Sequence, residues 1–324
     1  MPRSLVTHLV CLLLPLVVGC QSAVDQAIVI VESIGGEVRQ HEAFDGTQSW
    51  EVSFEGCHVQ PPQVAALGNL EPLVQLNLRQ AHLTPAAFEQ LRTLAHLERL
   101  DLYGSNVADP QLVELKSLNS LTWLSVANTA VTDRGLEAIA RIPQLTHLAA
   151  PPATTDLGVR HLADLPELRT LSLIDTQVSG STLSVFAAHP LEVLWLQNTP
   201  LTSDGVQQVG DLHQLRRLSV ANTQITDDDF HALATLLELD YLDISETSVG
   251  DAGILHLLPL PRLYVIDAYQ TQITPAAVHS FQQQHPDIQF CTGIRSGTEN
   301  SPPRASASPP GHPRKPAKVV DPGV

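Results

Sequence analysis

The sequence predicts an α/β solenoid in which about ten stacked units form a horseshoe, with a parallel concave β-sheet and convex helices. Two observations predict this class. The hexapeptide LSVANT stands at 124–129 and again at 218–223, inside the same flanking pattern. Around each copy, a strand-like alternation of apolar and polar residues is followed by apolar residues at helical spacing.

A leucine marks the start of each unit. It recurs every 24 residues, except for two steps of 23, so the two hexapeptides lie four units apart. An earlier unit is visible at Val52, Phe54 and Val59, each 24 residues before an apolar residue of the next unit. The marker residues are Leu73, Leu97, Leu121, Leu145, Leu168, Leu191, Leu215, Leu239 and Leu263. A period held this long indicates a repeat array that spans 50–294.

Each unit is predicted to contain one strand and one helix. In LTWLSVANT the alternation indicates a strand with one buried face, so Leu124 and Val126 are expected in the core. In DRGLEAIARI, Leu136, Ile139 and Ile142 fall at three-residue steps, which indicates a helix. One unit cannot cover its own apolar side, and stacking therefore buries a continuous core.

The frame Leu-x-x-Leu-x-Leu-x-x-Thr resembles that of the leucine-rich repeat family. The resemblance implies binding on the concave face. It also implies that the side chain at the Thr position bonds the backbone of the turn after the strand, as Asn or Cys does in that family. Cys57 then belongs to this ladder and is not a redox centre. The ladder column reads Cys57, Ala81, Ser105, Thr129, Ala153, Thr176, Thr199, Thr223, Thr247 and Thr271.

Aspartates that follow the ladder mark predicted helix starts. Asp133 and Asp227 stand where a helix N-cap is expected. The three aspartates at 227–229 would also suit calcium, but capping and favourable charge in the first turn explain them without a metal. We therefore predict no metal site.

The N-terminus, MPRSLVTHLVCLLLPLVVGCQS, resembles a bacterial lipoprotein signal. Its apolar run at 9–18 is too short to span a bilayer and has the length of a signal-peptide core. Gly19-Cys20 then resembles a lipobox. This implies a signal peptide at 1–19, a lipid on Cys20 and an anchor in the bacterial cell envelope. Gln21, where an Asp would favour the inner membrane, favours the outer membrane; an ordinary secretory signal is the alternative.

The remaining cysteines are not expected to pair. Of the four in the chain, Cys11 would leave with the signal peptide and Cys20 would carry the lipid. Cys57 and Cys291 mark opposite ends of the array, about 45 Å apart at roughly 4.8 Å for each unit. A disulfide requires Cα atoms within about 7 Å, so a bond within one chain is excluded.

Both ends of the array need caps. At 20–49, Asp25 is expected to cap a helix that ends at Gly35-Gly36, after which SWEVSFEG enters the first strand. At the other end, Ile288 and Phe290 offer a final half-unit. The terminal units would otherwise expose their apolar faces.

Charge is distributed unevenly. The formal net charge is −16, yet five basic residues lie in the tail at 295–324, which is rich in Pro and Ser and predicted to be disordered. The array is therefore strongly acidic, which excludes nucleic acid as a partner. The tail could contact the array, anionic lipid or cell-wall polymer, or have no partner.

Exposed strand positions form three columns on the predicted concave face. The first is Glu51, Gln75, Arg99, Trp123, His147, Thr170, Val193, Arg217, Tyr241 and Val265; the second is Ser53, Asn77, Asp101, Ser125, Ala149, Ser172, Trp195, Ser219, Asp243 and Asp267; the third is Glu55, Arg79, Tyr103, Ala127, Pro151, Ile174, Gln197, Ala221, Ser245 and Tyr269. The columns contain two of the three Trp and three of the four Tyr. Aromatic and Arg side chains on a rigid face are typical interface anchors, although aromatics also suit strands.

We therefore predict a ligand-binding concave face. Its candidate residues are Arg99, Asp101, Tyr103, Trp123, His147, Trp195, Arg217, Tyr241, Asp243 and Tyr269. Between the two Trp, the unit LTHLAAPPATTD is degenerate and small residues predominate. This suggests a shallow trough between two indoles, roughly 14 Å apart; a drifted repeat that packs less well is the alternative.

The sequence contains none of the motifs of catalysis. It lacks a Gly-rich phosphate loop, HExxH, GxSxG and CxxC, and a lone surface His such as His147 is usually only solvated. We predict a non-enzymatic, cofactor-free, lipid-anchored envelope protein that binds a protein partner. The alternatives are a structural envelope protein without a discrete site, and a carbohydrate binder that stacks sugars on Trp123 and Trp195.

Overall fold

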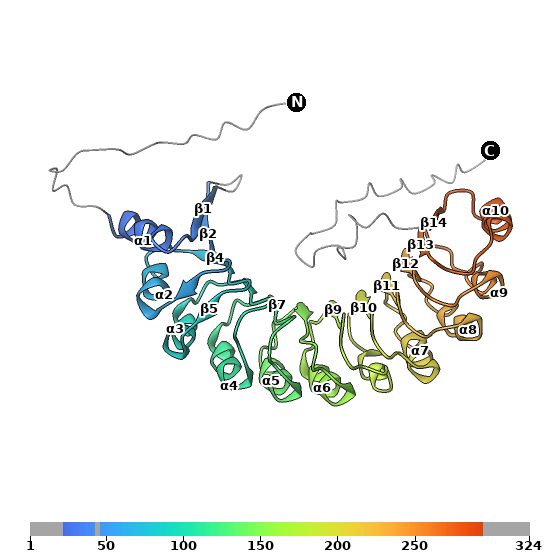
Figure 1. Cartoon of the computed structure of the whole chain (residues 1–324), viewed down its shortest axis with the longest axis horizontal. Coiled ribbons are helices and arrows are strands. Elements are labelled where there is room, and N and C mark those ends of the chain that lie inside the picture. The colour runs from blue at the N-terminus through green and yellow to red at the C-terminus, as the bar shows by residue number, and fades with distance from the viewer. Residues whose placement is uncertain (1–21, 43–45, 294–324) are drawn as a thin grey trace, which may run out of the picture.

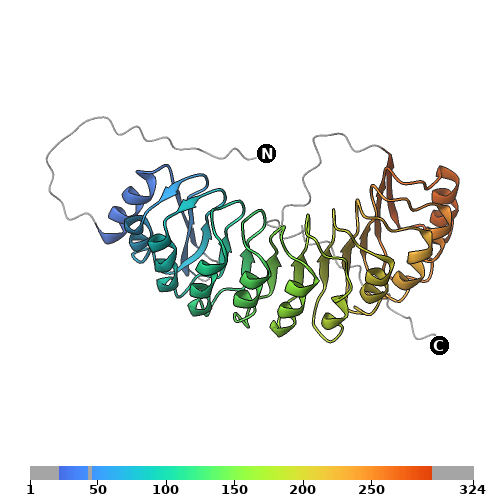
Figure 2. The same ribbon diagram turned by 60° about the horizontal axis from the view of Figure 1, so that its bottom comes forward.

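The computed structural model describes residues 22–42 and 46–293, which form one curved solenoid (Figure 1). Strands line the inner side of the curve and helices line the outer side (Figures 1 and 2). The predicted signal peptide, Cys20 and the tail at 295–324 lie outside the described residues. The architecture is the predicted α/β solenoid.

The described ranges contain one large sheet of 12 strands, in the order β1-β2-β4-β6-β7-β8-β9-β10-β11-β12-β13-β14, and a small sheet of β3 and β5. The strands are β1 Glu37–Glu42, β2 Gln48–Ser53, β3 His58–Val59, β4 Leu73–Asn77, β5 His82–Leu83, β6 Arg99–Asp101, β7 Trp123–Ser125, β8 His147–Ala149, β9 Thr170–Ser172, β10 Val193–Trp195, β11 Arg217–Ser219, β12 Tyr241–Asp243, β13 Val265–Tyr269 and β14 Gln289–Gly293. All neighbours in the large sheet are parallel, except β1 with β2. Parallel strands require a crossover, and the convex segments supply it.

The crossovers are short helices. The α-helices are α1 Ala23–Glu32, α2 Pro61–Leu67, α3 Pro85–Gln90, α4 Asp109–Leu112, α5 Asp133–Ile139, α6 Asp156–His161, α7 Ser203–Gly210, α8 Phe230–Leu233, α9 Asp251–Leu255 and α10 Pro275–Gln284. The 3₁₀ helices are η1 Leu91–Thr93, η2 Val113–Ser117, η3 Leu162–Asp164, η4 Leu183–Phe186 and η5 Asp227–Asp229. The predicted core residues Leu124, Val126, Leu136 and Ile139 are all fully buried between strands and helices.

The Thr ladder makes the expected contacts with one shift in position. Each ladder Thr donates its hydroxyl to the carbonyl oxygen three residues earlier, at 2.5 Å for Thr129 and 3.0 Å for Thr271. We predicted Ala153 in this column, but Thr154 takes the place and donates to Pro151 at 2.7 Å. The turn here is one residue longer than in the neighbouring units.

Pro152 explains the longer turn. Most units place a residue with positive φ before the ladder Thr, for example Asn128 with φ of 55° and Asn222 with φ of 49°. The proline ring holds φ near −65°, so Pro152 cannot adopt this conformation. The N–H of the left-handed residue also bonds the turn of the next unit in several other units, as Asn222 does to the Ser245 carbonyl at 2.9 Å. Proline has no N–H, and this series of bonds is therefore interrupted at Pro152.

A carboxylate clamp joins neighbouring helices, and it corrects our prediction about capping. Thr132 is the N-cap of α5, while Asp133 is the first helical residue. The Asp133 carboxylate accepts the backbone N–H of Thr155 at 2.9 Å and its hydroxyl at 2.6 Å, in the next unit. Asp109 binds Thr132 in the same way, at 2.7 Å for both bonds. These aspartates thus join successive units instead of capping their own helices.

Glycine makes room for this clamp. A Cβ on Gly135 would lie 2.6 Å from Oδ1 of Asp109, and one on Gly158 would meet Asp133. Asp227 likewise accepts the N–H of Gly250 at 2.7 Å, and Gly253 lies against it. In the recurring Thr-Asp-x-Gly, the aspartate therefore contacts the threonine and the glycine of the next unit.

The caps differ from the prediction in two details. Ser22, not Asp25, is the N-cap of α1, and Asp25 completes a capping box with it. The repeat frame also gave no sign of β1, a largely exposed strand that is polar except for Val38 and pairs antiparallel with β2. Polar side chains on an edge strand discourage further pairing. At the other end β14 extends the parallel sheet, with Ile288 buried as expected.

Both cysteines in the described residues are free thiols, as predicted from their separation. Cys57 is buried in the ladder column, and burial raises the pKa of its thiol. Its Sγ lies 3.7 Å from the Glu55 carbonyl oxygen. Cys57 therefore occupies a packing position.

Candidate functional site

The sheet register aligns the predicted columns. In the first column Arg99 lies beside Trp123, and Trp123 lies beside His147. Farther along, Arg217 pairs in register with Tyr241. In the second column Asp243 lies beside Asp267. The candidate residues therefore share one continuous face, on which they form two separate groups.

The first group is the N-terminal cluster, which comprises Arg79, Arg99, Asp101, Tyr103 and Trp123. Nη1 of Arg79 lies 3.2 Å from the Asp101 carboxylate, and its guanidinium lies 4.1 Å from the Tyr103 ring centroid. The Arg99 guanidinium lies 3.7 Å from the Trp123 ring centroid. These are cation–π distances. The chain thus supplies its own cations to the aromatic rings and the carboxylate of this cluster.

The N-terminal cluster leaves little of Trp123 for a ligand. Trp123 is only 8% exposed, because Arg99 covers its ring. Trp195 contacts Tyr241 at 6.0 Å between ring centroids, which places it toward β12 and away from Trp123. Both indoles thus pack against side chains of the chain itself, Trp123 against Arg99 and Trp195 against Tyr241, and these contacts do not support the trough that we predicted between them. The lean of each ring depends on its neighbours, which the repeat frame does not encode.

Arg99 and His147 are partly buried in the same neighbourhood. Burial lowers the pKa of the Arg99 guanidinium, while Asp101 and Glu51 act in the opposite direction. Nη2 of Arg99 is buried without a hydrogen-bond partner. Burial also lowers the pKa of His147, and the charges of Arg99 and Arg169 lower it further. A neutral His147 at pH 7 shares a 2.7 Å hydrogen bond between its Nδ1 and the Thr146 hydroxyl.

The second group is the C-terminal cluster, which comprises Trp195, Tyr241, Asp243, Asp267 and Tyr269. Trp195 and Tyr241 meet edge to face. The Tyr241 hydroxyl donates to Oδ2 of Asp267 at 2.6 Å. A chain of contacts therefore links the indole to a carboxylate across strands β10 to β13.

The second column is less exposed than we predicted. Asp101 is 7% exposed and Asp243 is 3% exposed. Asp243 accepts the Ser219 hydroxyl at 3.0 Å and the Ser245 N–H at 3.0 Å. Both aspartates therefore organise the sheet surface, and the exposed part of the face belongs to longer side chains around them.

Of the two candidates not yet described in detail, Arg217 lies at the margin of the C-terminal cluster and Tyr269 lies within it. Arg217 is partly exposed and lies 3.8 Å from the Asp240 carboxylate. Tyr269 follows Asp267 by two residues, and its N–H bonds the Ser245 hydroxyl at 3.2 Å. Two contributors, Arg79 and Asp267, stood in the predicted columns but not among our candidate residues. The spacing of 22 residues between Arg79 and Asp101 is the signal that could have found the first.

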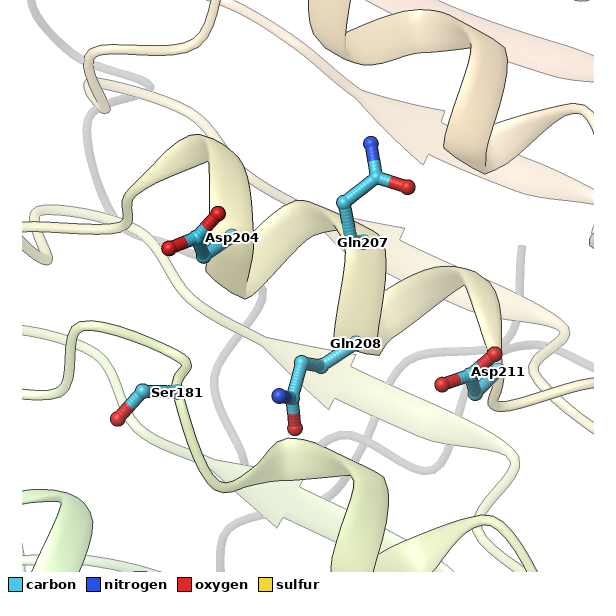
Figure 3. A pocket seen from close by; sticks show the side chains of 5 residues that line it. All are labelled: Ser181, Asp204, Gln207, Gln208 and Asp211. Atoms are coloured by element: carbon cyan, nitrogen blue, oxygen red, sulfur yellow. The ribbon is translucent and has the colours of Figure 1, made fainter.

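A polar depression on the convex side is a weaker candidate. Figure 3 shows its five side chains: Ser181, Asp204, Gln207, Gln208 and Asp211. The two glutamines already join neighbouring units, since Gln208 accepts the Ser184 N–H at 3.0 Å and Gln207 lies 2.9 Å from His231. In the described ranges no group of three or more His, Cys, Asp or Glu side chains is placed to hold a metal.

Among the residues that the structure describes, no helix is both long and apolar enough to cross a bilayer. The N-terminal segment, on which we placed the lipid anchor, lies outside this part of the chain.

A family match and one structural superposition agree with the fold. The family described as "Leucine Rich repeat" matches residues 117–140. An internalin from Listeria monocytogenes superposes with a TM-score of 0.52 at 18% identity, covering 76% of this chain and 82% of the internalin. Internalin C2 from the same organism has a TM-score of 0.42 at 22% identity, covering 71% of this chain and 83% of its own. A search of curated proteins finds no match. The described residues form a leucine-rich repeat solenoid.

Proposed function

We propose that this chain is a non-enzymatic binding module that holds a protein partner on its concave face. The observation that carries the proposal is the C-terminal cluster, where aromatic rings and carboxylates stand together on a stacked sheet. Rigid aromatic side chains supply contact area at low entropic cost, and they are frequent hot spots of protein interfaces. Repeat solenoids commonly use such extended concave surfaces for binding.

The anchor is the second part of the proposal. The sequence at 1–19 would direct export, and a lipid on Cys20 would hold the solenoid at the surface of a bacterial envelope membrane, with the outer membrane favoured. The acidic array would not itself adhere to anionic lipid. The lipid therefore supplies the membrane attachment and the solenoid supplies recognition.

A structural envelope role and glycan binding are the alternatives. Glycan stacking on a Trp123–Trp195 pair is disfavoured, because Trp123 is 8% exposed and covered by Arg99. Stacking on Trp195 alone would still be compatible with the geometry. A structural role without a discrete site predicts that no single surface substitution alters retention of any partner.

Capture from envelope extract separates these functions. The bait is the full chain, compared with Trp195→Ala/Tyr241→Ala and with Leu157→Ser, a control at a convex position that is 63% exposed. We expect a protein that the parent and the Leu157 variant retain and the double variant loses. Equal retention by all three baits, or capture of glycan alone, would contradict the proposal. Urea unfolding of each bait verifies that the double variant remains folded.

A further inference from the structure

The two clusters contain the same sequence element, but different side chains surround it. DLY at 101–103 and DAY at 267–269 both place an aspartate in the second column and a tyrosine in the third. Their tyrosines also have equivalent neighbours. Arg79 stands in the third column one strand before Tyr103, and Ser245 stands one strand before Tyr269. The two sites can therefore be compared residue by residue.

The N-terminal site contains an arginine that pairs with its aspartate, and no described Arg or Lys pairs with Asp267. Arg79 reaches the Asp101 carboxylate at 3.2 Å and covers the Tyr103 ring at 4.1 Å. At the corresponding position Ser245 has a short neutral side chain. In the part of the chain that the structure describes, no Arg or Lys forms an ion pair with Asp267 or Asp243. Their side-chain donors are the hydroxyls of Tyr241 and Ser219, and the Cys291 thiol on the next strand also hydrogen-bonds Asp267.

The surroundings of Asp267 favour a cation. Asp267 is partly exposed, and the buried carboxylate of Asp243 lies beside it in register and adds negative charge to the same part of the sheet. The indole of Trp195 is also partly exposed. The two described arginines that cover aromatic rings lie over Tyr103 and Trp123, not over Trp195. A guanidinium pairs with carboxylates in two-pronged geometry and stacks on aromatic faces, which an ammonium does less well.

We propose that Asp267, with Asp243, Tyr269 and Trp195 around it, is a receptor for an arginine side chain of the protein partner. The partner's guanidinium lies beside Asp267 in the same way as the Arg79 guanidinium lies beside Asp101. This inference rests on the proposed function and names the chemistry of the partner. Arg79 then shows within the same molecule how the bound arginine lies, paired to the carboxylate and stacked on the tyrosine.

A titration of the full chain in a neutral detergent tests the receptor. The probe is N-acetyl-arginine amide, and N-acetyl-citrulline amide is its neutral counterpart of similar shape. The readout is the indole N–H resonance of each Trp. We expect arginine amide to shift Trp195, which contacts Asp267 through Tyr241, and to leave Trp123 unshifted under its own Arg99. Citrulline amide should produce less than a tenth of the shift at equal concentration.

Two variants test the assignment of Asp267. Asp267→Asn keeps the shape and removes the charge, so affinity for arginine amide should fall about tenfold, as expected for loss of a charge-assisted bond. Ser245→Arg supplies an internal cation and should abolish the Trp195 shift. Ser245 is buried, so Ser245→Arg is informative only if the chain folds, whereas Asp267→Asn is conservative. Equal shifts from both probes, or an unchanged affinity in Asp267→Asn, would overturn the receptor.

Two further outcomes distinguish a partner's arginine from the chain's own tail, and the receptor from the proposed function. A Trp195 shift that appears only after Arg295, Arg304 and Arg314 are changed to Gln would show that the chain's own tail fills the site, and would overturn the assignment to a partner. The titration needs no partner protein. A receptor that binds arginine amide while envelope capture finds nothing would leave the receptor standing and refute the proposed function.

Discussion

The two LSVANT copies have the same six residues and the same strand-and-turn structure, but their serine and asparagine side chains make different contacts with the neighbouring units. Ser219 donates to the Asp243 carboxylate at 3.0 Å on the following strand, whereas the residue that pairs with Ser125 on the following strand is Ala149, whose side chain has no acceptor. The side chain of Asn222 donates to Asn198 at 2.7 Å, whereas Asn128 faces Gly104. The repeat frame therefore determines the backbone conformation, while the residues one unit away determine which hydrogen bonds the surface side chains make.

The same rule separates the two clusters. Asp101 and Asp267 have equivalent places in the fold, but Arg79 neutralises the first and no described Arg or Lys pairs with the second. A solenoid varies its binding chemistry by changing single residues in neighbouring units, without altering its fold. Matched substitutions in the two LSVANT copies distinguish the effects of the repeat's own residues from the effects of residues in neighbouring units.

Truncation of the core should affect both copies equally. Leu124→Ala and Leu218→Ala each empty a fully buried position, so each should lower the free energy of unfolding by about 2–5 kcal/mol. Urea denaturation followed by circular dichroism measures both. A difference between the two variants greater than the spread of repeated measurements would mean that packing, as well as polar contacts, differs between the copies.

Loss of the serine hydroxyl should separate the copies. Ser219→Ala removes a donor to a buried carboxylate and should cost roughly 1.5–3 kcal/mol of stability. Ser125→Ala should be nearly neutral, because among the described residues its hydroxyl makes no hydrogen bond to either of its register partners, Asp101 and Ala149. The same urea experiment compares the two, and equal losses would refute the claim that Asp243 depends on its neighbour.

The fold could be predicted from the sequence because its period is one-dimensional. The spacing of Leu73 to Leu263 defines the strand register, and the three columns follow from that register alone. What could not be predicted depends on side-chain direction. The Asp133 carboxylate points to Thr155 in the next unit, and Arg99 covers Trp123. Neither contact has a signature within one repeat.

The left-handed asparagines should show a smaller difference. Alanine lacks the side-chain amide that helps asparagine adopt a positive φ. Asn222→Ala and Asn128→Ala should therefore each lower the free energy of unfolding by roughly 1–2 kcal/mol. Asn222 also loses its bond to Asn198, so its variant should be less stable by about a further 0.5 kcal/mol. Glycine at each position is the control, because it tolerates positive φ and isolates the side-chain bond.

The smallest expected effect is a dependence on pH beside the first copy. The pKa of His147 in the folded chain is lowered by burial and by Arg99 and Arg169. The unfolded chain therefore takes up this proton first as the pH falls below about 6.5, and the folded state loses stability. The equivalent neighbour of the second copy is Tyr241, which has no imidazole. His147→Gln should reduce the loss of stability between pH 7 and pH 5, measured by urea denaturation at each pH.

Amide hydrogen exchange of the full chain, with and without a captured partner, tests the central claim most directly. The claim is that the partner binds the concave face through the C-terminal cluster. We predict slower exchange in the segments that carry Trp195, Tyr241 and Asp267, with little change at Trp123 and on the convex helix α6. Protection confined to α6 and the other convex helices, or centred on β6 and β7, would contradict the account.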